Sequence, residues 1–354
     1  MKINEFRKAI EKNNIDSFLL YNPINIFYFT KFLTQSLARL IVTVDKTPIL
    51  YVPELEYEEA ISTAQNCEVK EISSQTTALE KIKECFKEFK IKTCGIEENI
   101  ITKKEFEDLN KVLDIEFSNQ EEIISVLRSI KTNKELKFLR ESAKIADIGM
   151  EKAIESIEPG KSELEIAALA EYEMRKNGSE PIPFDTIIAT GIRSAFPHAK
   201  STNHKIKNGD LIILDMGAKY NGYASDTSRT IIVGKPSKKQ KEIYNLVLKS
   251  QTTTESKCHA GLRADELDSI AREIIKNKDY GKFFNHSLGH GVGLDVHERP
   301  TISFRNKNEL VINNVITIEP GIYIPALGGV RIEDTVIVKN NDCEVLNKVE
   351  KLEF

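Results

Sequence analysis

Acidic residues lie within apolar stretches of the second half of the chain, where strands are expected to be buried. Asp215 interrupts one such run, and Asp226 lies 11 residues further on. Between them, Asn221-Gly222 is a strong signal for a short β-hairpin. If the turn centres between Tyr220 and Asn221, Asp215 faces Asp226 with their Cβ atoms about 5 Å apart. Facing carboxylates can share a cation, although each aspartate taken alone is an ordinary cap or turn residue.

A second pair of acidic residues repeats this arrangement. Glu319 and Glu333 lie in the strand-like stretches 315–324 and 330–338, which a glycine turn separates. Both stretches are apolar enough to be buried, and a buried carboxylate does not stay ionised without a partner. That leaves three interpretations: an ion pair with Arg331, a protonated carboxyl, or a bound cation.

Three histidines lie in one glycine-rich segment that runs from His286 through His290 to His297. Glycines on both sides of His290 leave space for the backbone and for whatever the imidazole approaches. A phosphate-binding loop is disfavoured, because the segment has no Gly-Lys-Ser/Thr. A single histidine is usually a packed core residue, but two of them beside four strand acids indicate a binding site. We expect His204, His259 and His286 to be surface or packing residues.

Four carboxylates and one imidazole are therefore candidates for a single site: Asp215, Asp226, His290, Glu319 and Glu333. Four negative charges brought together raise one another's pKa values, so the fold requires compensating cations. Oxygen-rich ligation with one nitrogen suits Mn²⁺, Co²⁺, Fe²⁺ or Zn²⁺. Two divalent ions would cancel the charge and activate water near neutral pH. The residues predict metal-assisted hydrolysis.

The length of 354 residues predicts two domains of about 150 residues each. In the first 125 residues short apolar runs alternate with amphipathic stretches, a pattern typical of an α/β domain. A continuous helix is expected over 121–157, with the domain junction inside it near residue 126. Further helices are expected at 77–89, 103–113, 162–176, 237–256 and 263–276.

Charge and cysteine usage limit the environment and the partners. The 50 basic and 54 acidic residues leave a formal charge of -4, so there is no global attraction to nucleic acid or to a membrane. The five cysteines show no CxxC spacing, which disfavours a disulfide framework or a cysteine zinc site and favours a reducing compartment. The first residues lack the apolar core of a signal peptide. Polar residues interrupt the apolar window 17–33, which predicts a buried strand, a turn and a helix. We expect a cytoplasmic protein.

The five candidate ligands, in this order, resemble those of the pita-bread metallopeptidases, which include methionine aminopeptidase, aminopeptidase P and prolidase. Their spacings of 11, 64, 29 and 14 residues are similar to those of small prolidases. Segment 286–298 fits the proline-peptidase signature. Segment 183–199 resembles the part of these enzymes that carries the first substrate-binding histidine, here His198. Segments 16–32 and 126–140 are also similar to Xaa-Pro peptidases.

The resemblance implies an α/β amino-terminal domain of the creatinase/prolidase type over residues 1–126. An α+β pita-bread catalytic domain would follow over residues 127–354. The amino-terminal domain argues against methionine aminopeptidase. The complete ligand set argues against the creatine-cleaving relatives and against a catalytically silent peptide-binding protein on this fold. That silent protein, or an aminopeptidase of other specificity, is the alternative.

The implied activity is hydrolysis of the bond between an N-terminal residue and a following proline, as in Xaa-Pro dipeptidase or aminopeptidase P. The resemblance implies two divalent ions per subunit, Mn²⁺ or Co²⁺ first, with Zn²⁺ or Fe²⁺ as alternatives. Glu319 would carry the proton, and His198 and His297 would bind substrate and stabilise developing oxygen charge. Phe184 is a candidate wall of the proline pocket. The implied partners are Xaa-Pro dipeptides or short Xaa-Pro peptides and a second subunit in a homodimer.

One position departs from the family pattern. Many prolidases carry an arginine four positions after the second histidine, where it is thought to hold the carboxylate of the dipeptide. This chain has Thr301 there, with Arg299 and Arg305 nearby as replacements. Longer Xaa-Pro peptides therefore stay open as substrates beside dipeptides.

Overall fold

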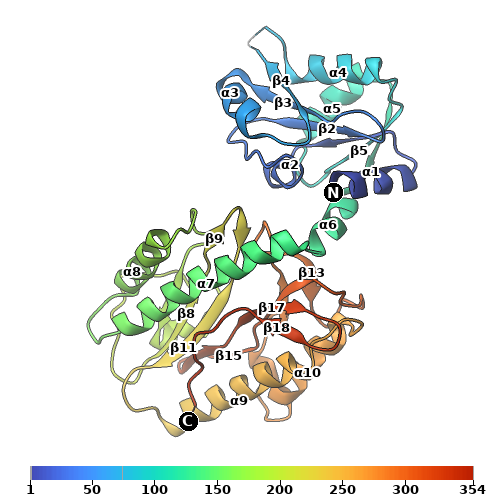
Figure 1. Cartoon of the computed structure of the whole chain (residues 1–354). Coiled ribbons are helices and arrows are strands. Elements are labelled where there is room, and N and C mark those ends of the chain that lie inside the picture. The colour runs from blue at the N-terminus through green and yellow to red at the C-terminus, as the bar shows by residue number, and fades with distance from the viewer. Residues whose placement is uncertain (1, 74, 354) are drawn as a thin grey trace. The chain divides into compact units, whose positions relative to one another are not determined.

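The computed structural model describes residues 2–73 and 75–353. It divides into two compact units, Met1–Leu127 and Arg128–Phe354, and Figure 1 follows the chain through both. All the site residues predicted from the sequence lie in the second unit. None of the helices in the described ranges combines the length and apolar character needed to cross a membrane.

The described part of the first unit contains a six-stranded sheet in the order β4-β3-β2-β1-β5-β6. Pairs β3–β4, β1–β5 and β5–β6 are parallel, whereas β1–β2 and β2–β3 are antiparallel, so the sheet is mixed. The elements of this unit are α1 (Lys2–Lys12), β1 (Ser17–Leu20), α2 (Pro23–Thr30), β2 (Arg39–Thr43), β3 (Ile49–Pro53), α3 (Glu54–Thr63), β4 (Glu68–Ile72), α4 (Ala78–Glu88), β5 (Thr93–Ile96), α5 (Lys103–Val112) and β6 (Glu116–Asn119). Helix α6 (Glu121–Ser129) contains the boundary between the two units.

Side chains of β1 alternate between the two faces of this sheet, as expected for a strand. The ring of Phe6 from α1 lies 5.2 Å from that of Phe18 and 4.6 Å from that of Phe29 in α2. Leu19 belongs to the core on the other face, which includes Phe86 of α4. The window 17–33 is therefore the predicted buried strand, turn and helix.

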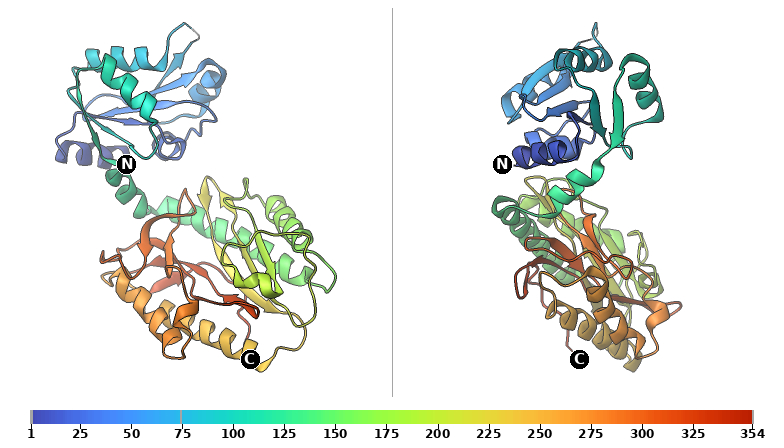
Figure 2. Two further views of the ribbon diagram at one scale, coloured as in Figure 1. Left: turned by 180° about the vertical axis from the view of Figure 1, so that it is seen from behind. Right: turned by 90° about the vertical axis from the view of Figure 1, so that its right-hand side faces the viewer.

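In the second unit, strands lie between the helix pairs α7–α8 and α9–α10 (Figures 1 and 2). One core joins α7 and α8 to β7 and β8, and another joins α9 and α10 to β14 and β17. Its elements are α7 (Asn133–Ser156), α8 (Glu163–Lys176), β7 (Ile187–Thr190), a 3-10 helix η1 (Gly191–Ala195), β8 (Leu211–Met216), β9 (Lys219–Tyr220), β10 (Tyr223–Ala224), β11 (Thr227–Ile232), α9 (Lys238–Glu255), α10 (Ala264–Lys276), η2 (Gly281–Phe283), β12 (Gly289–Gly291), β13 (Glu298–Ile302), β14 (Val315–Ile318), β15 (Gly321–Ile324), β16 (Gly328–Arg331), β17 (Asp334–Val338) and β18 (Cys343–Val345).

The helices predicted from periodicity are confirmed to within one or two residues at each end. Four of them begin with capping boxes in which a hydroxyl side chain accepts the N–H three residues on; these caps are Thr77, Thr102, Ser162 and Ser237. The prediction of one continuous helix over 121–157 is wrong. The chain forms two helices, of which the first ends at Ser129 and the second begins at Asn133, because Thr132 forms another capping box with Glu135.

The predicted facing of Asp215 and Asp226 is also wrong. Strand β8 pairs with β11 so that Asp215 lies opposite Ser228. Asn221 and Gly222 both have positive φ, 50° and 81°, so they are the two central residues of the turn. The turn therefore centres one residue later than expected, and the register shifts by two. Because side chains alternate with a period of two, this shift leaves the aspartates on the same face.

Glu319 and Glu333 lie in a gap between two antiparallel ladders. Strand β14 pairs with β17, and β15 pairs with β16, in one common register that places Glu319 opposite Glu333. The predicted strands 315–324 and 330–338 are therefore each interrupted at the acidic residue. A single β-bridge joins Glu333 to Ser228 of β11, which brings this gap against the first hairpin.

Candidate metal centre and active site

The predicted ligands all lie at or beside strand ends, where carboxylates can leave the apolar interior of a sheet. Asp215 is in β8, Asp226 directly precedes β11, His290 is in β12, Glu319 directly follows β14, and Glu333 directly precedes β17. Three separate stretches of the chain thus contribute, and the structure brings all five residues to one place.

His290 lies in the middle of this group. Its Nε2 is 3.5 Å from Asp226 Oδ2 and 3.4 Å from Glu319 Oε1. Ligand atoms of Asp226, His290 and Glu333 lie within 4.8 Å of one another. These separations allow the side chains to share cations after small rotations.

The electrostatics of the group favour a bound cation. Burial raises the pKa of Asp226, Glu319 and Glu333 above their usual range, and the neighbouring carboxylates raise it further. For Glu319 the pKa reaches about 8. Burial, followed by the neighbouring His297, lowers the pKa of His290 to about 4, so its imidazole is neutral, as a metal ligand must be.

Two buried carboxylate oxygens at this centre, Asp215 Oδ1 and Glu333 Oε1, have no hydrogen-bond partner among the described residues. The other oxygen of each carboxylate is bonded: Glu333 Oε2 accepts from Ser228 Oγ at 2.6 Å, and Asp215 Oδ2 accepts from Arg331 Nη2 at 2.5 Å. Leaving a buried carboxylate oxygen unpaired is costly. A divalent cation is a partner suited to several carboxylates and one imidazole, so the residues fit a metal centre.

Arg331 organises one side of the group. Besides Asp215 it donates from Nε to Ser228 Oγ at 2.9 Å and from Nη1 to Tyr323 OH at 3.0 Å. Arg331 therefore bonds the carboxylate of Asp215. The sequence analysis had considered Glu319 and Glu333 as the partners of this arginine. Tyr323 OH also lies 3.0 Å from Nε2 of the half-buried His286, whose pKa is lowered to about 4 by desolvation.

The two histidines expected to bind substrate lie beside this centre. The His297 ring is 4.1 Å from the His290 ring, centroid to centroid. His297 is exposed at its surface, yet partial desolvation lowers its pKa, while the charge of Asp215 acts in the opposite direction. His198 is exposed, and Phe184 is half-buried with its ring against Gly217, close to the Asp215 strand. Pro197, the residue before His198, accepts from Arg331 Nη1 at 3.2 Å, so the loop of His198 lies beside the same arginine that bonds Asp215.

Close packing of the backbone explains why glycines flank His290 in the sequence. A Cβ atom on Gly289 would overlap the carbonyl oxygen of Thr317, and one on Gly291 would overlap that of Arg299. Thr317 also accepts from His290 N at 3.1 Å and donates to Glu319 Oε1 at 3.2 Å. The sequence analysis missed Thr317, although it lies two residues before Glu319 in the strand predicted over 315–324, where residues two apart share a face.

The residue after His297 is held by two buried cations, which the sequence analysis also missed. Glu298 accepts from Arg128 Nη2 at 2.6 Å and from Lys131 Nζ at 2.8 Å. Lys131 is only 1 % exposed, and Arg128 also bonds Asp295 at 2.6 Å. The last turn of α6 and the stretch that leads to α7 are therefore fastened to the start of β13, directly after the loop that carries His297.

The position where many prolidases carry an arginine is an exposed threonine of β13, Thr301. Its carbonyl accepts a hydrogen bond from Asn306 at 2.7 Å. The nearby Arg305 is exposed, and its guanidinium lies 5.2 Å from the Phe304 ring centroid.

Comparison with known proteins agrees with this geometry. Residues 137–340 match the model of metallopeptidase family M24, and residues 2–130 match the creatinase/prolidase N-terminal domain. The chain is 44% identical over 353 residues to the Xaa-Pro dipeptidase of Pyrococcus furiosus, covering 99% of this chain and 98% of that one.

Solved structures extend the similarity to the whole chain. A Xaa-Pro dipeptidase from Bacillus anthracis is similar with a TM-score of 0.95 and 38% identity, over 100% of this chain and 98% of that one. An X-Pro aminopeptidase from Thermotoga maritima gives a TM-score of 0.92 and 35% identity, over 99% of each. The predicted α/β amino-terminal domain followed by a pita-bread catalytic domain is confirmed, and the family is one that uses divalent metal ions. The chain belongs to metallopeptidase family M24.

Proposed function

We propose that this protein hydrolyses the bond between an N-terminal residue and a following proline, with Xaa-Pro dipeptides as its main substrates. The observation that carries the proposal is the convergence of four carboxylates and one neutral imidazole, with two carboxylate oxygens left unpaired. The 44% identity to a Xaa-Pro dipeptidase supports the choice of substrate.

The cofactor that fits this centre is a pair of divalent cations, Mn²⁺ or Co²⁺ first, with Zn²⁺ or Fe²⁺ as alternatives. The residues that would hold them are Asp215, Asp226, His290, Glu319 and Glu333. When bound, the ions supply Lewis-acid activation of water and of the scissile carbonyl.

The remaining steps are assigned to side chains of this chain. Glu319 would take a proton from the attacking water and return it to the leaving proline nitrogen. His297 and His198 would donate hydrogen bonds to the oxygen charge that develops in the tetrahedral intermediate. Phe184, packed against Gly217, would contact the proline ring. We place the boundary between the amino-terminal creatinase/prolidase-type domain and the catalytic domain near residue 126.

A second candidate is an Xaa-Pro aminopeptidase that acts on longer peptides. Thr301 supports it, because its neutral hydroxyl cannot form the ion pair with the substrate carboxylate that the arginine of many prolidases is thought to form. The similarity to the Thermotoga maritima X-Pro aminopeptidase points the same way.

One experiment separates these functions. The protein is stripped of metal, reloaded with each of the four ions, and assayed on Ala-Pro and on Ala-Pro-Ala. Faster cleavage of the dipeptide supports the dipeptidase, and faster cleavage of the tripeptide supports the aminopeptidase. Inactivity with every ion would contradict both and favour a silent peptide-binding protein. Sedimentation of the same sample tests the homodimer, and the cytoplasmic location stays a prediction.

A further inference from the structure

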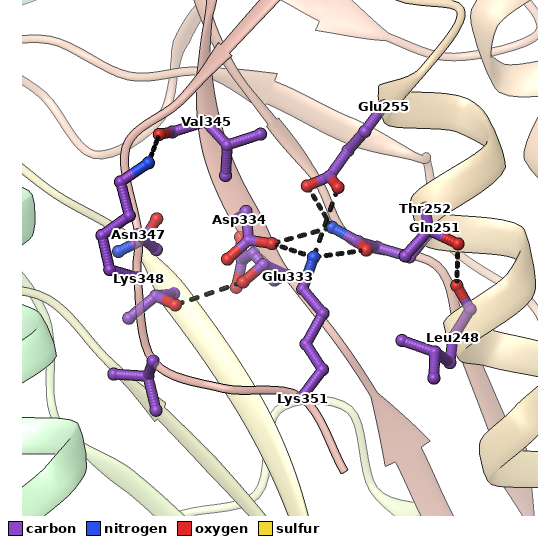
Figure 3. A network of polar contacts seen from close by, with 12 residues as sticks. Leu248, Gln251, Thr252, Glu255, Glu333, Asp334, Val345, Asn347, Lys348 and Lys351 are labelled. Atoms are coloured by element: carbon purple, nitrogen blue, oxygen red, sulfur yellow. Dashed lines mark hydrogen bonds and ion pairs between the residues drawn. The ribbon is translucent and has the colours of Figure 1, made fainter. Parts of the chain in front are cut away.

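The C-terminal segment, residues 346–352, lies beside β17, the strand that directly follows the candidate ligand Glu333. Leu346 N donates to Thr335 O at 2.9 Å, and Leu352 N donates to the hydroxyl of Tyr244 at 2.9 Å. These hydrogen bonds fix the segment at both ends. Figure 3 shows that Lys351 points from this segment towards Asp334, the residue directly after Glu333.

Asp334 is a buried carboxylate with two cationic partners. Its Oδ1 accepts from Arg229 Nη2 at 2.7 Å, and its Oδ2 lies 2.6 Å from Lys351 Nζ. The Asp334 side chain is 0 % exposed and that of Arg229 is 2 % exposed. Lys351 is less buried, with 19 % of its side chain exposed, but removing a partner of the fully buried Asp334 still costs more than breaking an ion pair at the surface.

The same arginine binds the main chain of Glu333. Arg229 Nη1 donates to Glu333 O at 2.7 Å, while Glu333 N donates to Ser228 O at 3.1 Å. Arg229 is therefore bonded both to the backbone of the ligand residue and to the side chain of Asp334. A movement of Asp334 would be passed to Glu333 through the peptide bond and through this guanidinium.

Lys351 is itself fixed by helix α9. Its Nζ donates to Gln251 Oε1 at 2.8 Å and to Glu255 Oε2 at 3.2 Å (Figure 3). Gln251 Nε2 in turn donates to Asp334 Oδ2 at 3.0 Å. One ammonium group thus ties together helix α9, strand β17 and the C-terminal segment.

We propose that Lys351 is a positioning residue for the metal centre. By holding Asp334 in place together with Arg229, it fixes the direction of the Glu333 carboxylate, whose Oε1 has no partner among the described residues. This inference rests on the metal centre proposed above. Loss of a residue that orients a metal ligand typically lowers metal affinity or activity by about 10- to 100-fold.

The test compares metal binding by metal-stripped full-length variants. Lys351→Met removes the charge, Lys351→Arg keeps it, and Lys348→Met alters an exposed lysine of the same segment whose Nζ bonds the Val345 carbonyl. Calorimetric titration with Mn²⁺ should show affinity at least about 10-fold weaker for Lys351→Met. The visible spectrum of the Co²⁺-loaded variant should change as well. We expect Lys351→Arg to recover most of the affinity and Lys348→Met to match the wild type.

Circular dichroism of each metal-free variant shows whether it folds. If Lys351→Met does not fold, Lys351→Gln, which keeps a polar donor without the charge, takes its place with the same expected loss. Mn²⁺ affinity within about 2-fold of the wild type and an unchanged Co²⁺ spectrum would overturn the inference. Wild-type protein that binds ions without cleaving Xaa-Pro peptides rejects the proposed function alone, since the affinity comparison still decides the role of Lys351. Wild-type protein that binds no ion rejects both.

Discussion

Replacing Glu298 by glutamine tests whether Arg128 at the end of α6 and Lys131 just after it support the loop that carries His297. Glu298 is 9 % exposed and bonds two cations, Arg128 and Lys131. Breaking a buried ion pair by removing one partner costs about 3–5 kcal/mol. We expect the lower part of this range, because Arg128 keeps Asp295 and Lys131 keeps the carbonyl of Ser129 at 3.4 Å.

A loss of about 3 kcal/mol lowers the melting temperature of a unit of this size by roughly 6–12 °C. Circular dichroism follows the melting of the metal-free protein, since the chain has no tryptophan. The value of kcat/KM should also fall, because His297 is the preceding residue, whereas Mn²⁺ affinity should be unchanged. Glu350→Gln, at an exposed position, is the matched control. A Glu298→Gln protein within about 0.5 kcal/mol of the wild type and with normal kcat/KM would refute the reasoning.

Three further changes test other parts of the site and the fold. Glu319→Gln should lower kcat at least about 100-fold while the circular dichroism spectrum stays unchanged, and normal turnover would remove the proposed proton carrier. Gly289→Ala should weaken Mn²⁺ binding, because its Cβ atom would force β12 away from Thr317; unaltered binding in a titration would contradict this packing argument. Burial raises the pKa of Asp147 to about 6, so its protonated form favours the folded state and stability is lost as pH rises from about 4 to 6, by roughly 2–3 kcal/mol. Urea unfolding at several pH values should show a flatter profile for Asp147→Asn, and an unchanged profile would contradict the burial of this carboxyl.

Local signals in the sequence were sufficient for most helices and for choosing candidate ligands that the fold brings together. Caps such as Thr77 and Ser162 depend on residues three apart, so they can be read directly. The break before Asn133 carried the same signal, Thr132 with Glu135, but the apolar stripe running through it outweighed the cap in the prediction.

The hairpin register needed more than the presence of Asn221-Gly222. A two-residue turn of type I′ has positive φ at both central positions, and Asn221 and Gly222 are the two residues that show it, so the turn centres between them. The error did not separate the two aspartates, because a register shift of two residues leaves Asp215 and Asp226 on the same face of the hairpin.

Contacts between distant residues could not be predicted from local pattern. Arg331 and Asp215 are 116 residues apart, and Lys131 and Glu298 are 167 residues apart. Only the folded chain shows which buried charge compensates which. The same holds for Lys351, whose partners come from α9 and β17.

The central claim is that five side chains from separate strands hold two divalent cations. Anomalous diffraction from crystals of the Mn²⁺-loaded protein tests it most directly. The account predicts two peaks about 3.5–4 Å apart, both among Asp215, Asp226, His290, Glu319 and Glu333. Fully loaded crystals with no peak at these residues, or with manganese bound only elsewhere, would contradict it.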